Sequence, residues 1–320
     1  MLRSAVVICI GLVLLHEAER LGANDESTES TIGNEKYEEL VELDGGHFWK
    51  GTDDRSAKDG SFPPQLTFVK KFKINKYPVT NFSFRKFAVA EDYVSTAEEY
   101  EWSFVFESDV PDNIKSQITD KLPNAEWWMP VPEARWDQPE GEGSSIDDRL
   151  NWPAVHISHI DAEAYCKWKG LRLPTDDEWE FAVRGTLIKK KYPWGDKFEK
   201  RRMNIWQGKF PKENKALDGY PTVAPVDAFP PQNDYGMYDM LGNVWEWTST
   251  VYKQSGTAER NPQYTLRGGS FVDSKGGSFN HKAGTTVKMG NERDAGSNNL
   301  GFRCASDVPD EDDEFDKDEL

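Results

Sequence analysis

The most informative stretch of this sequence reads Asp239-Met240-Leu241-Gly242-Asn243-Val244-Trp245-Glu246-Trp247. The glycine and asparagine in its middle are typical of a turn, and the two tryptophans that follow are large enough to anchor a core. Asp239 and Glu246 bring two carboxylates, and the backbone at Gly242 and Val244 adds two carbonyls. Hard cations such as Ca²⁺ are bound by such mixtures of oxygen ligands. We therefore expect either a calcium-holding turn or an ordinary acidic turn beside a buried aromatic strand.

A second oxygen-rich stretch lies upstream of this one. Asn204 with the carbonyl of Ile205, and Asp218 with the carbonyl of Tyr220, offer the same kinds of ligand across a longer loop. The spacing is not that of an EF-hand, whose loop follows one fixed pattern. From the chemistry of these residues, calcium binding and plain turn capping are alternative interpretations.

Around these loops we expect short strands and few helices. Turn residues bound apolar runs at residues 47–49, 67–72 and 264–271, which predict strands. Capping boxes at residues 158–161 and 175–178 predict two helices that end at Gly170 and Gly185, and a third helix is expected to begin at Thr80 or Asn81. Residues 101–149 are expected to form an extended aromatic loop region. The pattern predicts one α+β domain with much irregular structure.

The charge of the chain is strongly acidic. Its 320 residues include 39 Lys and Arg against 56 Asp and Glu, a net charge of −17. This excess argues against nucleic acid or an anionic membrane as the main partner. Residues 307–320 hold nine acids and one lysine, a net of −8, so about half of the excess belongs to one terminal segment.

Both ends of the chain carry targeting patterns. Residues 1–23 fit a secretory signal peptide, because the apolar run at residues 5–15 is well short of the roughly 20 residues that span a bilayer. The last four residues spell KDEL, the retrieval signal that the KDEL receptor reads. We expect a resident of the endoplasmic reticulum lumen without a membrane span. Its parts are an acidic disordered segment at 24–37, a folded body at 38–306 and an acidic tail at 307–320.

Cysteines are few. Cys9 belongs to the expected signal peptide, so Cys166 and Cys304 would remain in an oxidising lumen. Two cysteines allow one intramolecular disulfide, and the alternative is two buried free thiols. A bond would join the middle of the chain to its end, which favours one domain over two.

Familiar catalytic motifs are absent from the sequence, which contains no G-x-S-x-G, P-loop or H-E-x-x-H pattern. His156 and His159 have the spacing of a metal-binding pair, but they lie at the first capping box, to which the nearby Asp161 belongs. We expect both to be ordinary structural side chains.

Six motifs, in order along the chain, resemble those of the formylglycine-generating enzyme (sulfatase-modifying factor) family. They lie in a body that runs from about Leu43 to Ala305. The motifs are Pro78-Val79-Thr80-Asn81, Gly170-Leu171-Arg172-Leu173-Pro174-Thr175 with Glu178-Trp179-Glu180, Tyr192-Pro193-Trp194-Gly195, Gly242-Asn243-Val244-Trp245-Glu246-Trp247, Arg267-Gly268-Gly269-Ser270 and Asn299-Leu300-Gly301-Phe302-Arg303-Cys304. The resemblance implies a single compact domain related to C-type lectins.

The resemblance also implies bound metal and a disulfide. Family members hold two calcium ions, and a disulfide would link Cys166 to Cys304. The ligands implied here are Asn204, Ile205, Asp218 and Tyr220 for one ion, and Asp239, Gly242, Val244 and Glu246 for the other.

Active members of the family oxidise a cysteine of unfolded sulfatases to formylglycine, using two copper-binding cysteines shortly after the Arg-Gly-Gly-Ser motif. In this chain Asp273 and Ser278 stand at those two positions. Neither supplies the soft thiolate that Cu(I) selects. A second family disulfide is missing too, with Val183 where one partner would stand. The resemblance is therefore to a non-catalytic branch of the family.

A non-catalytic branch implies a binding function without copper. The expected partners are nascent sulfatase polypeptides and the active formylglycine-generating enzyme, in a heterodimer that modulates sulfatase activation. A homodimer is the alternative assembly.

Other hypotheses remain at the level of sequence. Asp273, with Ser270 or His281 nearby, would support a different acid–base chemistry in the same cleft. A calcium-dependent carbohydrate binder rests on the fold resemblance alone. Asn81-Phe82-Ser83 is a glycosylation sequon at an expected exposed helix start, so Asn81 is a candidate glycan site unless it caps that helix.

Overall fold

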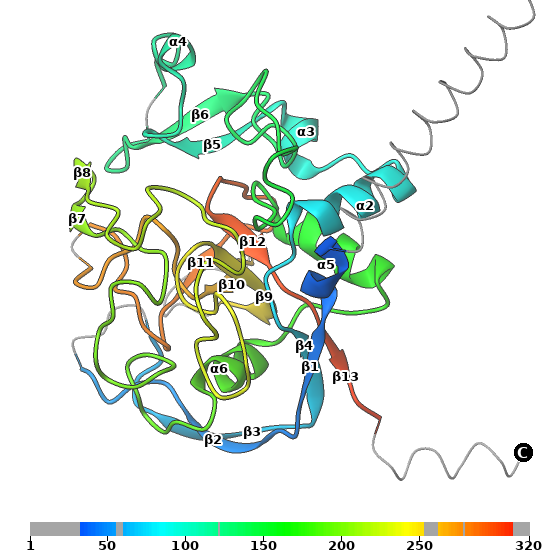
Figure 1. Cartoon of the computed structure of the whole chain (residues 1–320), viewed down its shortest axis with the longest axis vertical. Helices are drawn as coiled ribbons and strands as arrows, with labels where there is room; N and C mark the ends of the chain where they lie inside the picture. Colours follow the sequence, from blue (N-terminus) through cyan, green and yellow to red (C-terminus); the bar gives the residue numbers. More distant parts are fainter. Residues whose placement is uncertain (1–32, 56–59, 121, 253–261, 278, 310–320) are drawn as a thin grey trace, which may run out of the picture.

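The computed structural model describes residues 33–55, 60–120, 122–252, 262–277 and 279–309 (Figure 1). The expected signal peptide, residues 24–32, Ser278 and the KDEL sequence lie outside these residues. The helices are η1 (Lys36–Glu38), α2 (Asn81–Glu91), α3 (Thr96–Tyr100), α4 (Asp112–Lys115), α5 (His159–Trp168) and α6 (Asp176–Arg184). The strands are β1 (Leu40–Leu43), β2 (Gly46–Lys50), β3 (Gln65–Val69), β4 (Phe72–Asn75), β5 (Trp102–Phe106), β6 (Trp128–Pro132), β7 (Gly208–Lys209), β8 (Glu213–Asn214), β9 (Trp245–Val251), β10 (Tyr264–Arg267), β11 (Lys288–Asn291), β12 (Leu300–Phe302) and β13 (Ala305–Asp307). Short strands, few helices and long connections confirm the α+β prediction.

A four-stranded sheet with the order β11-β10-β9-β12 lies at the centre of the molecule (Figure 1). β9 pairs antiparallel with β10 and parallel with β12. The first four residues of β9 are buried, and Trp245 and Trp247 pack in one cluster with Leu300 and Phe302 of β12. The stretch 239–247 therefore forms a turn followed by the central strand.

The capping boxes expected from the sequence open two helices. Ser158 Oγ accepts a hydrogen bond from the Asp161 amide at the start of α5, and Thr175 Oγ1 accepts one from the Glu178 amide at the start of α6. Thr80 caps α2, as expected for one of the two candidate positions. The structure adds a capping box at Ser95, which opens α3.

Two further sheets surround the centre. β1, β4 and β13 form a three-stranded antiparallel sheet, and β2 pairs with β3 in a ribbon that curves beneath α6 (Figure 1). A disulfide joins Cys166 of α5 to Cys304, which lies between β12 and β13, with a Cα separation of 5.6 Å. The disulfide prediction is confirmed and the free-thiol alternative is wrong. The bond fastens α5 to the strand that closes the outer sheet.

Residues 101–149 were expected to form one extended loop, and this expectation is wrong. β5 pairs antiparallel with β6, from Trp102 opposite Pro132 to Phe106 opposite Trp128. Together with α3 and α4 this hairpin stands at the top of Figure 1. Val105 and Val131 are fully buried in a separate small cluster, which explains how so short a hairpin is stabilised.

The start of the folded body lies earlier than expected. Residues 33–37 are helical, and Tyr37 is only 6% exposed. The Tyr37 hydroxyl donates to Asp227 Oδ2 at 2.6 Å, and its ring meets the Tyr77 ring at 5.2 Å. The expected disorder is therefore wrong for residues 33–37, because Tyr37 has long-range partners that fix it.

The expected exposure of Asn81 is also wrong. This side chain is 4% exposed, and its Nδ2, the atom to which a glycan attaches, donates to the Arg149 carbonyl at 2.9 Å. The segment that ends at Trp152 covers the helix start, since the Asn81 amide donates to the Trp152 carbonyl. Within the described residues, no helix has both the length and the apolar character needed to cross a membrane.

Candidate functional site

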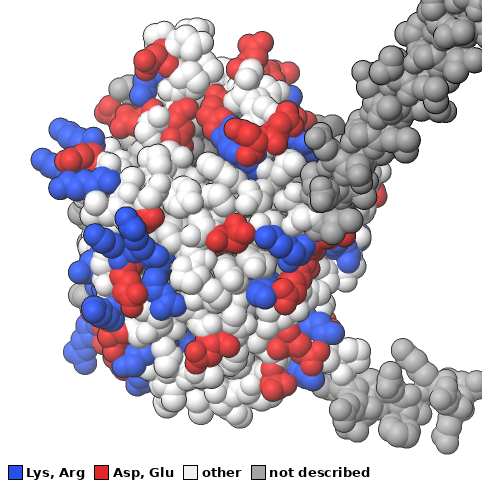
Figure 2. All heavy atoms as spheres, viewed as in Figure 1, with Lys and Arg blue, Asp and Glu red and all other residues white. Residues whose placement is uncertain are grey.

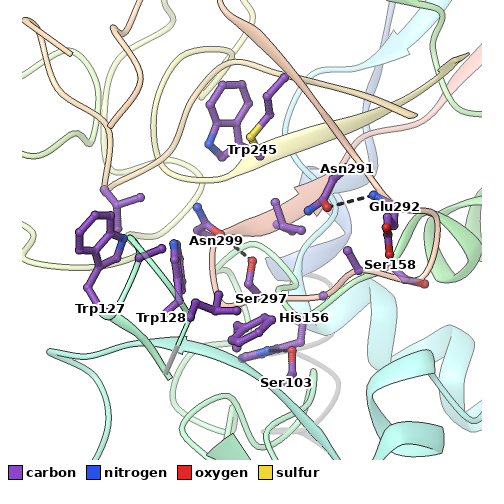
Figure 3. Close-up of a pocket in the computed structure, with 18 of the residues that line it drawn as sticks. Ser103, Trp127, Trp128, His156, Ser158, Trp245, Asn291, Glu292, Ser297 and Asn299 are labelled. Carbon is purple, nitrogen blue, oxygen red and sulfur yellow. Dashed lines mark hydrogen bonds between the residues drawn. The ribbon is translucent and has the colours of Figure 1, made fainter. Parts of the chain in front are cut away.

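A cavity of about 670 Å³ lies between the β5–β6 hairpin and the central sheet. Figure 3 shows Trp127 and Trp128 along one side of it and Asn291 along the other. Trp245, from the first position of β9, and Asn299, just before β12, also line it. Aromatic faces with amide groups between them suit a ligand that has both apolar and hydrogen-bonding parts, such as a polypeptide.

Asp273 lies in the wall of this cavity and is 1% exposed. Its Oδ2 accepts hydrogen bonds from the Ser270 amide at 2.7 Å and from the Ser270 hydroxyl at 3.1 Å. Its Oδ1 accepts one from the His281 amide at 2.9 Å. Burial raises the pKa of the Asp273 carboxyl. The two oxygens thus tie Ser270 and His281 to Asp273, which is a structural use of the carboxyl group.

The polar residues that surround Asp273 are tied to one another. Asn299 Nδ2 donates to Ser270 Oγ at 2.9 Å, and Ser297 Oγ donates to Asn299 Oδ1 at 2.7 Å. The His281 ring meets the Trp245 ring edge to face at 5.0 Å. The sequence-based interpretation named Asp273, Ser270 and His281 but missed Ser297 and Asn299. The signal for Asn299 was present, because this residue opens the motif that ends at Cys304.

The sequence holds no cysteine other than Cys9, Cys166 and Cys304, and the last two form the disulfide. The cavity wall therefore has a buried carboxyl group, and no thiolate, at position 273. Ser278, the other position expected to have lost a cysteine, lies outside the described residues.

The first expected calcium ligand set contains a buried oxygen that lacks a hydrogen-bond partner among the described residues. Asn204 is fully buried, and its Oδ1 accepts no hydrogen bond from the described residues. Asp218 contacts the residue that follows Asn204, because Asp218 Oδ2 accepts from the Ile205 amide at 3.1 Å, and Asp218 Oδ1 accepts from the Tyr220 amide at 3.1 Å. Burial raises the pKa of Asp218. An unpaired amide oxygen beside a desolvated carboxylate fits a hard cation.

The second expected ligand set is also buried. Asp239 is 2% exposed, and burial, with the charge of Glu246 nearby, raises its pKa to about 8. Gly242 has φ +86°, and a Cβ there would overlap the Asn204 carbonyl oxygen, so the loop requires glycine. A cation beside Asp239 would offset the cost of burying its carboxylate.

Glu246, by contrast, already has a cationic partner. Its Oε1 and Oε2 accept from Arg303 at 2.7 Å each, and Oε2 also accepts from Trp179 Nε1 at 2.7 Å. Asn243 joins the two ligand sets, because its Oδ1 accepts from Asn204 Nδ2 and its Nδ2 donates to Asp239 Oδ2. The two expected sets therefore form one connected, buried polar layer.

His156 and His159 are both fully buried and have different partners. His156 shares one hydrogen bond with Ser103 Oγ at 2.8 Å and another with the Pro139 carbonyl at 2.9 Å. His159 Nε2 bonds to the Thr248 carbonyl at 3.1 Å, and its ring stacks on Tyr264 at 3.7 Å. These contacts support their interpretation as structural side chains.

Comparison with known proteins identifies the family. The model of the sulfatase-modifying factor enzyme 1-like domain matches residues 26–308. An "Inactive C-alpha-formylglycine-generating enzyme 2" of Bos taurus is 50% identical over 275 residues, which cover 86% of this chain and 90% of that protein. A "Formylglycine-generating enzyme" of Mus musculus is 42% identical over 281 residues, covering 84% and 75%.

Solved structures agree on the fold. The structure of PvdO from Pseudomonas aeruginosa has a TM-score of 0.59 at 20% identity and covers 84% of this chain and 94% of that one. Because the match to the family model spans most of the chain and the two relatives are similar over nearly the same part, the assignment is clear: the chain belongs to the sulfatase-modifying factor (formylglycine-generating enzyme) family.

Proposed function

We propose that this chain is a calcium-binding, non-catalytic member of the family, which binds sulfatase polypeptides or the active formylglycine-generating enzyme and thereby modulates sulfatase activation. The observation that carries the proposal is the cavity wall at Asp273. The family scaffold and an open aromatic cavity are present, but a hydrogen-bonded carboxyl group stands where the resemblance places a copper-binding cysteine. The bovine relative, at 50% identity, bears a name that calls it inactive.

The binding half of the proposal rests on the character of the cavity. Trp127, Trp128 and the 78% exposed Phe279 supply aromatic surface, while the partly exposed Asn291 supplies an amide group for a peptide backbone. An unfolded polypeptide presents both kinds of group. This match supports a segment of an unfolded sulfatase as the occupant of the cavity. Active members of the family act on substrates of this kind.

Calcium has a structural role in the proposal. The calcium ions would be held by side-chain oxygens of Asn204, Asp218 and Asp239 and by the carbonyls of Ile205, Tyr220, Gly242 and Val244. Glu246 would contribute a carboxylate lone pair that Arg303 does not use. When bound, calcium supplies positive charge that offsets the buried carboxylates. The unpartnered Asn204 Oδ1 is the main support for this assignment.

The endoplasmic reticulum lumen is the proposed location. A disulfide between Cys166 and Cys304 is typical of an oxidising compartment, and the KDEL sequence at residues 317–320 is the proposed address. Deleting residues 317–320 should move the protein from the lumen into the medium of cultured cells. Unchanged retention would contradict retrieval by the KDEL receptor.

The experiment that tests binding is a titration of the purified chain with a fluorescent cysteine-containing sulfatase peptide and, separately, with the active enzyme. Phe279→Ala removes exposed aromatic surface from the cavity, and Phe68→Ala removes a similarly exposed phenylalanine, 58% exposed, from β3. We expect Phe279→Ala to weaken peptide binding about fivefold to tenfold and Phe68→Ala to leave it unchanged. Absence of binding to both partners by the unmodified chain would reject the proposal.

A further inference from the structure

A second cavity, of about 620 Å³, lies on the other side of the segment that bounds the first. Residues 279–281 line both cavities, but the second is otherwise formed by residues 51–54, 189–191, 276–277 and 282–287, with Arg184 and Asp196. Of the residues proposed to bind polypeptides, Phe279 alone also lines this second cavity. Its volume is in the range of about 300–1,000 Å³ that is usual for sites of small molecules.

Lysines dominate the charges in this cavity. Lys189 pairs with Asp53 at 2.9 Å, Lys190 with Asp196 at 2.6 Å, and Lys282 with Asp54 at 3.3 Å. Each of these charges is thus offset by a carboxylate on the rim. Asp53, Asp54 and Asp196 are therefore already engaged in ion pairs.

Lys191 differs from its neighbours. It is partly buried, and among the described residues no carboxylate lies within ion-pair distance of its Nζ, which instead lies 5.1 Å from the centre of the Tyr192 ring. Burial and the charge of Lys282 lower the pKa of Lys191. The three aspartates that line the cavity each pair with a lysine other than Lys191, which favours an anion from outside the chain as the partner of Lys191.

The surroundings strengthen this local charge. Residues 185–215 contain ten Lys and Arg and three Asp and Glu, a net of +7 in a chain whose net charge is −17. Figure 2 shows Lys and Arg gathered along the edge of the molecule that carries β7 and β8. A concave site beside such an edge concentrates anions from solution.

The rest of the lining is largely polar. Thr52, Thr286 and Asn280 bring hydroxyl and amide groups, and Gly284 packs so close to Lys191 that a Cβ there would lie 3.3 Å from the Lys191 carbonyl oxygen. Such groups suit a ligand with several hydroxyls rather than an apolar one. The geometry points to a site for a sulfate or phosphate monoester of a small sugar, with the oxyanion between Lys191 and Lys282 and the sugar hydroxyls toward Thr52 and Thr286.

Isothermal titration calorimetry on the full chain at low ionic strength tests this inference. The probes are glucose 6-sulfate, glucose 6-phosphate, glucose and inorganic sulfate. Lys191→Met removes the unpaired charge, Lys191→Arg keeps it, and Lys209→Met removes an exposed lysine of β7 outside the cavity. Far-ultraviolet circular dichroism checks that each variant is folded, and Lys191→Arg reports on the site even if Lys191→Met does not fold.

We expect at least one ester to bind and glucose not to bind. Binding should weaken about tenfold or more in Lys191→Met, and should stay within about threefold in Lys191→Arg and Lys209→Met. Preference for one ester tells sulfate from phosphate, and either preference supports the site. Failure of both esters to bind, equal binding by Lys191→Met, or inorganic sulfate binding as tightly as the esters would overturn it. Because Lys191 and Lys282 line the second cavity and not the first, these results do not depend on the proposed binding of polypeptides.

Discussion

Arg303 and Glu246 form an ion pair in which both side chains have no exposed surface. Arg303 Nε donates to Glu246 Oε2 and Arg303 Nη2 donates to Oε1, each at 2.7 Å. Arg303 also donates to the carbonyls of Asn75 and Tyr238. One side chain thereby joins the central strand β9, the end of β4 and the loop before the turn at residue 239.

Replacing Arg303 should be costly. Arg303→Met leaves Glu246 buried without its cation, so the free energy of unfolding should fall by about 3–5 kcal/mol in urea denaturation. Arg293→Met breaks the exposed pair with Glu163, at 2.6 Å, and should cost less than about 1 kcal/mol. If both variants lose a similarly small part of the free energy of unfolding, the buried pair stabilises the fold no more than the exposed pair does.

The disulfide should be a main source of stability. Cys166 and Cys304 are 138 residues apart, and closing so long a loop restricts the unfolded chain by about 4–5 kcal/mol in the entropic description. Cys166→Ala with Cys304→Ala should therefore lower the free energy of unfolding by about 2–5 kcal/mol. Dithiothreitol in the denaturant should lower the stability of the unmodified chain and leave the double variant unchanged. A double variant as stable as the unmodified chain would contradict this account.

Acid should destabilise the fold through its buried histidines. Burial lowers the pKa of His156 to about 4, whereas an unfolded histidine has a pKa of about 6.5. Between these values the unfolded chain binds a proton that the folded chain does not. The free energy of unfolding should therefore fall as the pH drops from 6.5 toward 4, by about 1.4 kcal/mol per pH unit for this residue.

His156→Gln provides the check on this pH dependence. Its free energy of unfolding, measured by urea denaturation at several pH values, should fall with a shallower slope than that of the unmodified chain, although its stability at pH 7 is lower. His159, whose pKa burial also lowers to about 4, should add a similar part of the slope. Parallel pH profiles for His156→Gln and the unmodified chain would exclude this role.

Removing calcium should loosen the polar layer around Asn204, Asp218 and Asp239. Calcium at about 100 times its dissociation constant would stabilise the chain by about 2.7 kcal/mol, so a chelator should lower the melting temperature. Asp218→Asn should shrink this chelator effect, while Asp148→Asn, at an 87% exposed side chain, should preserve it. A melting temperature that does not respond to chelator would argue against both calcium sites.

Local signals in the sequence predicted helix starts well. The capping boxes at Ser158 and Thr175 depend on residues three apart, and both were found where the spacing placed them. The same pattern at Ser95 was overlooked. The run at residues 67–72 contains the end of β3 and the start of β4, and the strand expected at 264–271 ends at Arg267.

Contacts between residues far apart in the chain could not be predicted from the sequence. Trp102 to Phe106 pair with a strand that begins more than 20 residues later and contains two prolines, so neither strand was recognisable alone. Tyr37 is fixed by Asp227, 190 residues away. Arg303 was recognised only as part of a motif, because arginine is usually exposed and its burial depends on a partner 57 residues distant.

The central claim is that the cavity at Asp273 binds family substrates without oxidising them. Its most direct test is to incubate the purified chain with a cysteine-containing sulfatase peptide, Cu(I), oxygen and a thiol reductant, and to follow the peptide by mass spectrometry, with the active formylglycine-generating enzyme in parallel. We predict that the active enzyme converts cysteine to formylglycine and that this chain leaves the thiol unchanged. Formylglycine formed by this chain at a rate near that of the active enzyme would contradict the account.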